Sequence, residues 1–138
     1  MGHITPSAEQ FEALRREHDL AARVTMLNLL RFRDEAHYPE YPDETPCSGR
    51  EAYARYAKAA GACVHSHGGR VVFSGPIRST LIGPEDERWD SMLLVEYPSL
   101  RAFLEMIESD TYRAIVHHRS AAVEDSRLIP VVDGETLD

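Results

Sequence analysis

The chain has 138 residues, a length that suits one domain with a single core. Its formal net charge of −8 argues against nucleic acid and anionic membranes as partners, because a negative surface repels phosphate groups. No apolar run approaches the roughly 18 residues of a membrane span. Residues 1–20 also contain no apolar signal core, so we expect a cytoplasmic protein.

The first part of the chain predicts a helix, a strand, a long loop and a second helix. Residues 5–20 form the expected first helix, with Ser7 and Gln10 at the positions of a capping box, and residues 22–32 form an apolar strand. Residues 34–49 hold three prolines and five acidic residues. We expect this acidic loop to stay out of the core and to act as a lid, a dimer-contact arm or a mobile excursion. Residues 50–67 form the second helix.

The second part predicts a hairpin, two helices and a last strand. Residues 70–82 form a strand in which Gly75–Pro76 implies a bulge or an edge position, since proline cannot donate to a sheet. A turn at 83–86 leads into a strand at 88–97. Helices follow at 100–109 and 110–124, and then a strand and a frayed tail at 133–138.

This order defines an α+β fold. Without the added first helix it reads βαββαβ, the ferredoxin-like plan, so we expect one domain over 1–138 with its ferredoxin-like core at 22–132. The strands are apolar on both sides, whereas a sheet covered on one face alternates apolar and polar residues. A second copy of the sheet is the economical cover for the other face. We therefore expect a homodimer.

Four segments together resemble a known family. They are MLNLLRFRD (26–34), GREAYARYA (49–57), GGRVVFSG (68–75) and WDSMLLVEYPSLRAFLEM…YRAIVHHRSAAVEDSRLI (89–106 and 112–129). In order and spacing they resemble the bacterial domain-of-unknown-function family numbered thirteen-thirty, in the dimeric α/β barrel superfamily. The resemblance covers residues 24–130, with the first helix and the acidic loop as additions. It implies two protomers that join their sheets into a barrel. Relatives in the superfamily include cofactor-independent monooxygenases, lactone isomerases, haem peroxidases and ligand sensors.

The candidate catalytic residues are polar groups on apolar elements. Asn28 lies in the middle of a strand, where it either orients a ligand or makes a structural hydrogen bond. Glu96 is a candidate general base if it faces a dry barrel, and a solvent-facing charge otherwise. One of His117 and His118 is a candidate acid or base in a cleft.

Five further residues are candidates for substrate binding. Arg31 and Arg78, near strand ends, would hold an anionic group or pair with Glu96. The aromatic candidates also have a packing interpretation, and they are Tyr53, Trp89 and Tyr112.

Histidine and cysteine spacing predicts no metal site. The pairs His65–His67 and His117–His118 lack the i, i+4 spacing that directs two imidazoles to one ion, and no HExxH occurs. Cys47 and Cys63 have no CxxC spacing and are expected as free thiols. We expect no cofactor and no metal requirement for folding, although a haem-ligating histidine stays an alternative.

Two functions remain open from the sequence. One is a cofactor-independent enzyme of the monooxygenase, isomerase or cyclase type, acting on a small, partly apolar molecule. The other is a non-catalytic dimer that binds a small metabolite or serves as a stress or regulatory accessory. The fold alone does not choose between them.

Overall fold

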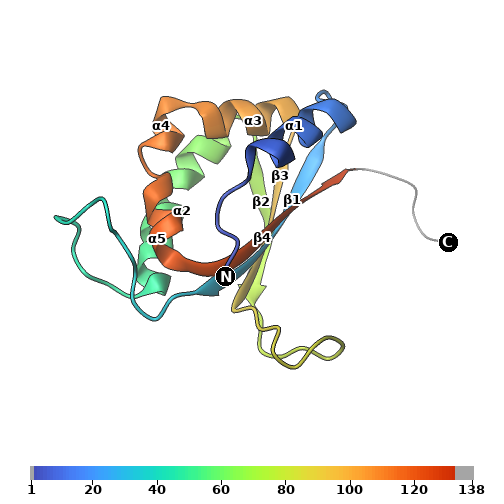
Figure 1. Cartoon of the computed structure of the whole chain (residues 1–138). Helices are drawn as coiled ribbons and strands as arrows, with labels where there is room; N and C mark the ends of the chain where they lie inside the picture. Colours follow the sequence, from blue (N-terminus) through green and yellow to red (C-terminus); the bar gives the residue numbers. More distant parts are fainter. Residues whose placement is uncertain (1, 133–138) are drawn as a thin grey trace.

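The computed structural model describes residues 2–132, which leaves the tail predicted to fray outside the described part. Figure 1 shows the elements in chain order: α1 (Ala8–Glu17), β1 (Val24–Phe32), α2 (Gly49–Ser66), β2 (Arg70–Pro76), β3 (Ser91–Tyr97), α3 (Leu100–Glu108), α4 (Asp110–Arg113), α5 (Val116–Ala122) and β4 (Val123–Val132). The strands form one antiparallel sheet in the order β2-β3-β1-β4. The predicted α+β, ferredoxin-like fold is confirmed.

The helices cover one face of the sheet (Figure 1). On that face, strand residues such as Val24, Met26 and Val95 are buried against α3 residues such as Phe103 and Leu104. Helix α1 adds its apolar side to the same core cluster. It begins at the predicted capping box, in which the Ser7 and Gln10 side chains each accept the other's backbone N–H.

The other face of the sheet carries no helix within the described residues (Figure 1). Residues paired across the strands share a face, so the register places one apolar row across all four strands of this open face. The row consists of Phe73, Leu94, Leu27 and Ile129. Phe73 is 56% exposed and Ile129 43% exposed, which makes the row an uncovered apolar surface in a single protomer.

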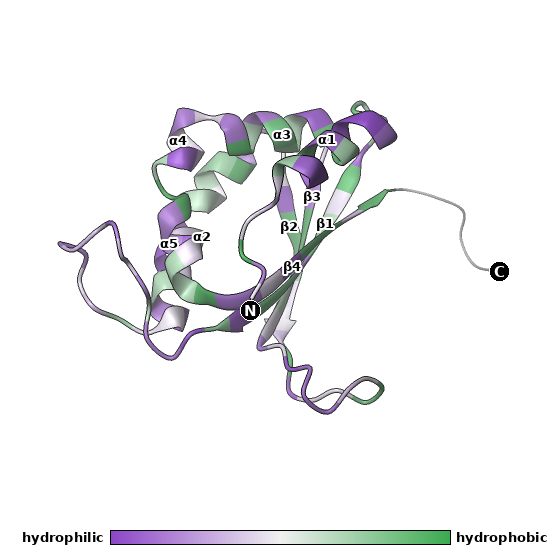
Figure 2. Ribbon diagram, in the orientation of Figure 1, coloured by the Kyte–Doolittle hydropathy of each residue, from purple (hydrophilic) through white to green (hydrophobic). Residues whose placement is uncertain are grey.

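Two predicted elements have different bounds in the structure. The strand predicted at 70–82 ends at Pro76, and the exposed loop that follows carries Leu81 and Ile82, which are 97% and 93% exposed. Figure 2 shows apolar residues in green at the tip of this loop. The helix predicted at 110–124 is divided into α4 and α5, because Ile115 has a non-helical backbone conformation.

The predicted bulge and edge position fall in the same strand. β2 is an edge strand, which accommodates Pro76 at its end. The irregular pairing lies between Val71 and Phe73, not at Gly75–Pro76. Among residues 2–132, no helix combines the length and the apolar character of a membrane span.

The acidic loop packs more closely than its composition predicts. Ala36, Tyr38 and Cys47 lie against a core cluster that includes Leu30 and Ala122. The expectation that the loop stays out of the core is therefore wrong for its two ends. The prolines and most of the carboxylates of the segment remain exposed, while Glu44 is partly buried. Cys47 and Cys63 are free thiols, as expected.

Asp125 anchors the N-terminal segment to β4. Its carboxylate accepts hydrogen bonds from the backbone N–H of His3 (2.9 Å) and Ser126 (2.9 Å) and from the Arg127 guanidinium (2.7 Å). Burial alone would raise the pKa of Asp125, but these donors outweigh it and hold the pKa below its ordinary value. A depressed folded-state pKa stabilises the protein above the unfolded pKa of about 3.9. That stability is lost as the pH falls through the lower folded pKa.

Asp125→Asn is expected to lower the free energy of unfolding by about 1–3 kcal/mol at pH 7, because it leaves buried donors without a charged acceptor. Urea unfolding at pH 7 and pH 3 tests this, and the gap to the wild type should narrow at the lower pH. Glu124→Gln, at the exposed neighbouring carboxylate, should stay within about 0.5 kcal/mol. An Asp125→Asn effect that is equally large at both pH values would contradict the electrostatic cause.

Candidate functional site

The acidic loop is attached to the end of α5 by backbone hydrogen bonds. The N–H groups of Arg33 and His37 donate to the carbonyls of Ala122 and Ala121, both at 2.9 Å. These bonds satisfy orphan carbonyls at the helix C-terminus. They also hold the loop residues that follow beside the first turn of α5.

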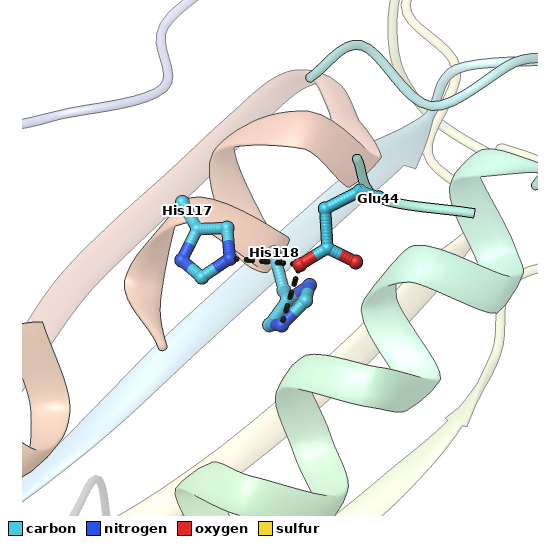
Figure 3. A group of neighbouring side chains, drawn as sticks. All are labelled: Glu44, His117 and His118. Atoms are coloured by element: carbon cyan, nitrogen blue, oxygen red, sulfur yellow. Dashed lines mark hydrogen bonds and ion pairs between the residues drawn. The ribbon is translucent and has the colours of Figure 1, made fainter. Parts of the chain in front are cut away.

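Glu44, from this loop, meets two adjacent histidines of α5. One carboxylate oxygen, Oε1, lies 3.4 Å from Nε2 of His117 and 4.0 Å from Nε2 of His118. Figure 3 shows both imidazoles directed toward that oxygen. We call these three side chains the histidine cluster. All three are partly buried.

Tyr38 and Arg55 fix the orientation of the cluster. The Tyr38 hydroxyl is hydrogen-bonded to Nδ1 of His118 at 2.8 Å. Arg55, from α2, lies 3.5 Å from the other carboxylate oxygen of Glu44 and donates to the Tyr38 hydroxyl at 3.5 Å. Three segments of the chain therefore converge here: the acidic loop, α2 and α5.

Two groups at this site, His118 and Tyr38, have shifted pKa values. Burial, followed by the neighbouring His117, lowers the pKa of His118, so its imidazole is neutral at neutral pH. Burial raises the pKa of Tyr38, although Arg55 opposes the rise, and the phenol stays protonated. The Nδ1 atom of His117 is buried and has no hydrogen-bond partner among the described residues.

A surface depression of about 350 Å³ borders the cluster. Its lining includes Glu40, Tyr41, Asp43 and Glu44, and the Tyr41 ring stacks on His117 with 4.0 Å between ring centroids. The lining combines an aromatic face with three carboxylates. Such a surface favours small neutral or cationic molecules over anions.

Asn28 is buried on the helix-covered face of β1, in line with the expectation that a mid-strand amide is buried. Its side-chain amide donates to the carbonyls of Met26 (3.3 Å) and Leu93 (3.4 Å). These bonds match the structural interpretation of this residue. The structure gives it no contact with the histidine cluster.

Glu96 and Arg31 lie on the open face of the sheet, apart from the cluster. Glu96 pairs with Arg70 at 3.4 Å, and Arg31 pairs with Glu124 at 3.4 Å. Of the two alternatives for Arg31 and Arg78, pairing with Glu96 does not occur in the structure, because Arg70 occupies that place. Because Asn28 and Glu96 stand on opposite faces, they do not form one site.

The remaining predicted site residues are dispersed. Tyr112 is buried, and its hydroxyl is hydrogen-bonded to that of Tyr56 at 2.9 Å. Tyr53 packs on Phe32, and burial raises the pKa of Tyr53 to about 12. Trp89 donates to Glu87 at 3.4 Å and stacks under Arg127, while Arg78 is exposed in the loop before β3.

Of the predicted catalytic residues, the structure brings together only His117 and His118. Sequence reasoning missed Tyr38, Glu44 and Arg55. Two tyrosines that each precede a proline, Tyr38 and Tyr41, were the available signal, because aromatic residues are unusual in a solvated acidic loop.

The antiparallel sheet, its one-sided helical layer and the convergence of loop and α5 define a ferredoxin-like α+β protein with a histidine–carboxylate cluster. The chain belongs to the family described as Domain of unknown function (DUF1330), whose model matches residues 43–134. This confirms the family indicated by the sequence. The match begins within the acidic loop, so α1 and β1 lie before it.

Solved structures extend the likeness over the whole chain. The RPA0582 protein of unknown function from Rhodopseudomonas palustris is 45% identical, with 99% of this chain and 100% of that chain covered and a TM-score of 0.88. A structure of the methylated RPA0582 protein is 46% identical, covering 97% and 96%, with a TM-score of 0.87.

A more distant structure shares the fold alone. The hydroxynitrile lyase from Passiflora edulis is 10% identical, with 86% of this chain and 99% of that chain covered and a TM-score of 0.58. No curated protein matches the chain.

Proposed function

We propose that the chain is an enzyme that binds a small, partly apolar molecule beside the histidine cluster and acts on it without an organic cofactor. The observation that carries this proposal is the 2.8 Å hydrogen bond between Tyr38 and His118, beside Glu44, which also lines an aromatic and acidic depression. A neutral imidazole oriented by a phenol can take a proton from a bound molecule or return one. Isomerase or cyclase chemistry needs only such proton transfers.

We also propose that the working form is a homodimer joined through the open face of the sheet. The apolar row from Phe73 to Ile129 supports this, because a monomer would leave it in water. Charged pairs such as Arg70–Glu96 flank the row, as polar rims surround the apolar centre of an interface.

The alternative function is a non-catalytic dimer that binds a metabolite. One observation favours it. Arg55 contacts both Glu44 and Tyr38, so these polar side chains already satisfy one another, as they do in a network that only stabilises the fold. In that case the depression binds a ligand and no bond in the ligand changes.

Native mass spectrometry of freshly purified protein tests both proposals, since it reports the oligomer mass and any carried-over small molecule. Against a molecule found in this way, His118→Gln should lower turnover by about 10²–10⁴-fold, the usual contribution of a positioned acid or base. His65→Gln, at an exposed histidine of α2, should leave turnover unchanged. Binding without turnover in the wild type would favour the alternative.

Ligand charge offers a second test that needs no identified substrate. In NMR titrations, benzylamine and benzyl alcohol should shift the amide signals of Glu40, Tyr41, Asp43 and Glu44 more than benzoate does, because the depression is acidic. A preference for benzoate would contradict the proposed site.

A further inference from the structure

The three side chains of the histidine cluster lie at the mutual distances of a metal-ligand set. Each offers one ligand atom, and these atoms all lie within 4.8 Å of one another. In a tetrahedral site with metal–ligand bonds of about 2.0–2.2 Å, neighbouring ligand atoms are about 3.3 Å apart. The distances from Glu44 to His117 (3.4 Å) and to His118 (4.0 Å) need only small side-chain rotations to reach this value.

Direct contacts alone do not explain why two imidazoles face one carboxylate oxygen. The 3.4 Å separation from His117 is longer than a good N–H···O hydrogen bond, and the 4.0 Å separation from His118 is outside hydrogen-bond range. At least one imidazole therefore gains little from Glu44. A cation between the three groups would give each of them a full bond.

Two contacts around the cluster, at His118 and at Glu44, match those that surround bound metal ions. A metal-binding imidazole is usually held by a hydrogen bond at its other ring nitrogen, and Tyr38 occupies that position on His118, 2.8 Å from Nδ1. When Nδ1–H donates to Tyr38, the lone pair of Nε2 is free and directed toward Glu44. Ligating carboxylates are in turn held by donors, and Arg55 lies 3.5 Å from the second oxygen of Glu44.

We propose that Glu44, His117 and His118 bind one divalent transition-metal ion of the Zn²⁺ class. Two imidazoles and one carboxylate suit zinc, cobalt, nickel or iron, whereas magnesium and calcium prefer oxygen ligands throughout. Three protein ligands leave a coordination position for water or a small oxygen-bearing molecule, and Glu44 also lines the adjacent depression. The inference rests on the same side chains as the proposed function and changes the role of one of them. With the ion bound, Nε2 of His118 is a ligand and not an acid or base, and the ion activates a bound molecule by polarising its oxygen.

The protein can fold without metal and still bind an ion at the histidine cluster. Tyr38 and the backbone bonds from Arg33 and His37 attach the acidic loop to α5 independently of any ion. Added metal should therefore raise the melting temperature of a protein that is already folded.

Titration of chelator-treated protein with Zn²⁺, Co²⁺ and Mg²⁺ by calorimetry tests the proposal. We expect one Zn²⁺ per chain, no competition by Mg²⁺, and a Co²⁺ absorption spectrum of the four- or five-coordinate type. Glu44→Gln, His117→Gln and His118→Gln should each weaken Zn²⁺ binding by more than the about 10–100-fold expected for Tyr38→Phe, which removes an outer contact. Circular dichroism of the metal-free variants establishes that each is folded.

Matched controls separate this site from adventitious binding. Glu40→Gln removes a carboxylate of the same depression, and the double variant His65→Gln/His67→Gln removes the other closely spaced histidines; both should retain Zn²⁺ affinity. The proposal is overturned if no Zn²⁺ binds at one per chain. It is equally overturned if binding survives all three cluster variants and is lost in the double variant or in Cys47→Ser.

The outcomes also separate this inference from the proposed function. If Zn²⁺ fails to bind while His118→Gln still abolishes turnover, the metal site is refuted and the proposed enzyme stands. If Zn²⁺ binds at the cluster but neither small-molecule binding nor turnover is found, the metal site stands and the proposed function is refuted.

Discussion

Gly49→Ala is expected to destabilise the protein severely, by about 3 kcal/mol or more. A Cβ atom at this position would lie 2.2 Å from the carbonyl oxygen of Arg33 and 2.6 Å from that of Ala122. Both are backbone atoms that hydrogen bonds fix in place, so neither moves away cheaply. The first residue of α2 thus sits where the chain leaving β1 and the end of α5 come closest.

Gly61→Ala is the matched control within the same helix. Nothing lies within 4 Å of the Cβ position at Gly61, so the substitution should raise the free energy of unfolding by about 0.5–1 kcal/mol through the better helix propensity of alanine. Equilibrium unfolding in urea at one fixed protein concentration compares the two variants. A Gly49→Ala protein as stable as the wild type would contradict the close approach of the Arg33 and Ala122 carbonyls to Gly49.

The same junction also holds the base of the acidic loop. Gly49 lies at the base of the segment that positions Tyr38 and Glu44, and its N–H donates to Arg33 at 3.1 Å. Any Gly49→Ala protein that folds should therefore bind Zn²⁺ more weakly than Gly61→Ala. This couples the packing at the loop base to the geometry of the histidine cluster.

Local patterns predicted most of the fold. The capping box predicted at Ser7 and Gln10 is present. Gly68, directly after α2, has a positive φ, and Ser99 caps α3, as these residue types favour. Such signals depend on residues close together in the chain, which makes them readable without the tertiary structure. The βαββαβ order follows from their sum.

The errors occur where distant segments decide the outcome. Residues 77–82 contain apolar residues that suit a strand, but the pairing of β2 ends at Pro76, and no strand within residues 2–132 pairs with the segment that follows. The helix predicted over 110–124 ends earlier than expected, because Val123 and the residues after it belong to β4 and pair with β1. Helical propensity is a weak preference and yields to such pairing.

The candidate site was predictable only in part for the same reason. His117 and His118 stand out in the sequence because histidine is chemically distinctive, but spacing along the chain does not reveal the carboxylate that faces them. Glu44 reaches them because backbone bonds from His37 to Ala121 place the acidic loop beside α5, a contact that has no sequence signature. Asn28 and Glu96 have the right residue types, but strand alternation places them on opposite faces.

Ile129→Glu is expected to convert the proposed homodimer into monomers. Ile129 ends the apolar row on the open face and pairs with Leu27 at its centre. In a two-fold dimer the substitution buries two carboxylates in an apolar interface, where an unpaired charge is costly. The dimer dissociation constant should rise at least about 100-fold, which corresponds to about 2.7 kcal/mol.

Leu128→Glu provides a control on the same strand. Leu128 is 41% exposed, almost as much as Ile129 at 43%, but alternation directs it to the opposite face of β4. The two variants carry the same added charge at neighbouring positions and differ in the face that bears it. Sedimentation velocity at micromolar concentration should therefore show monomers for Ile129→Glu and dimers for Leu128→Glu and the wild type. A monomeric wild type would refute the dimer itself, while equal dissociation of both variants would mean that charge alone, and not the open face, controls assembly.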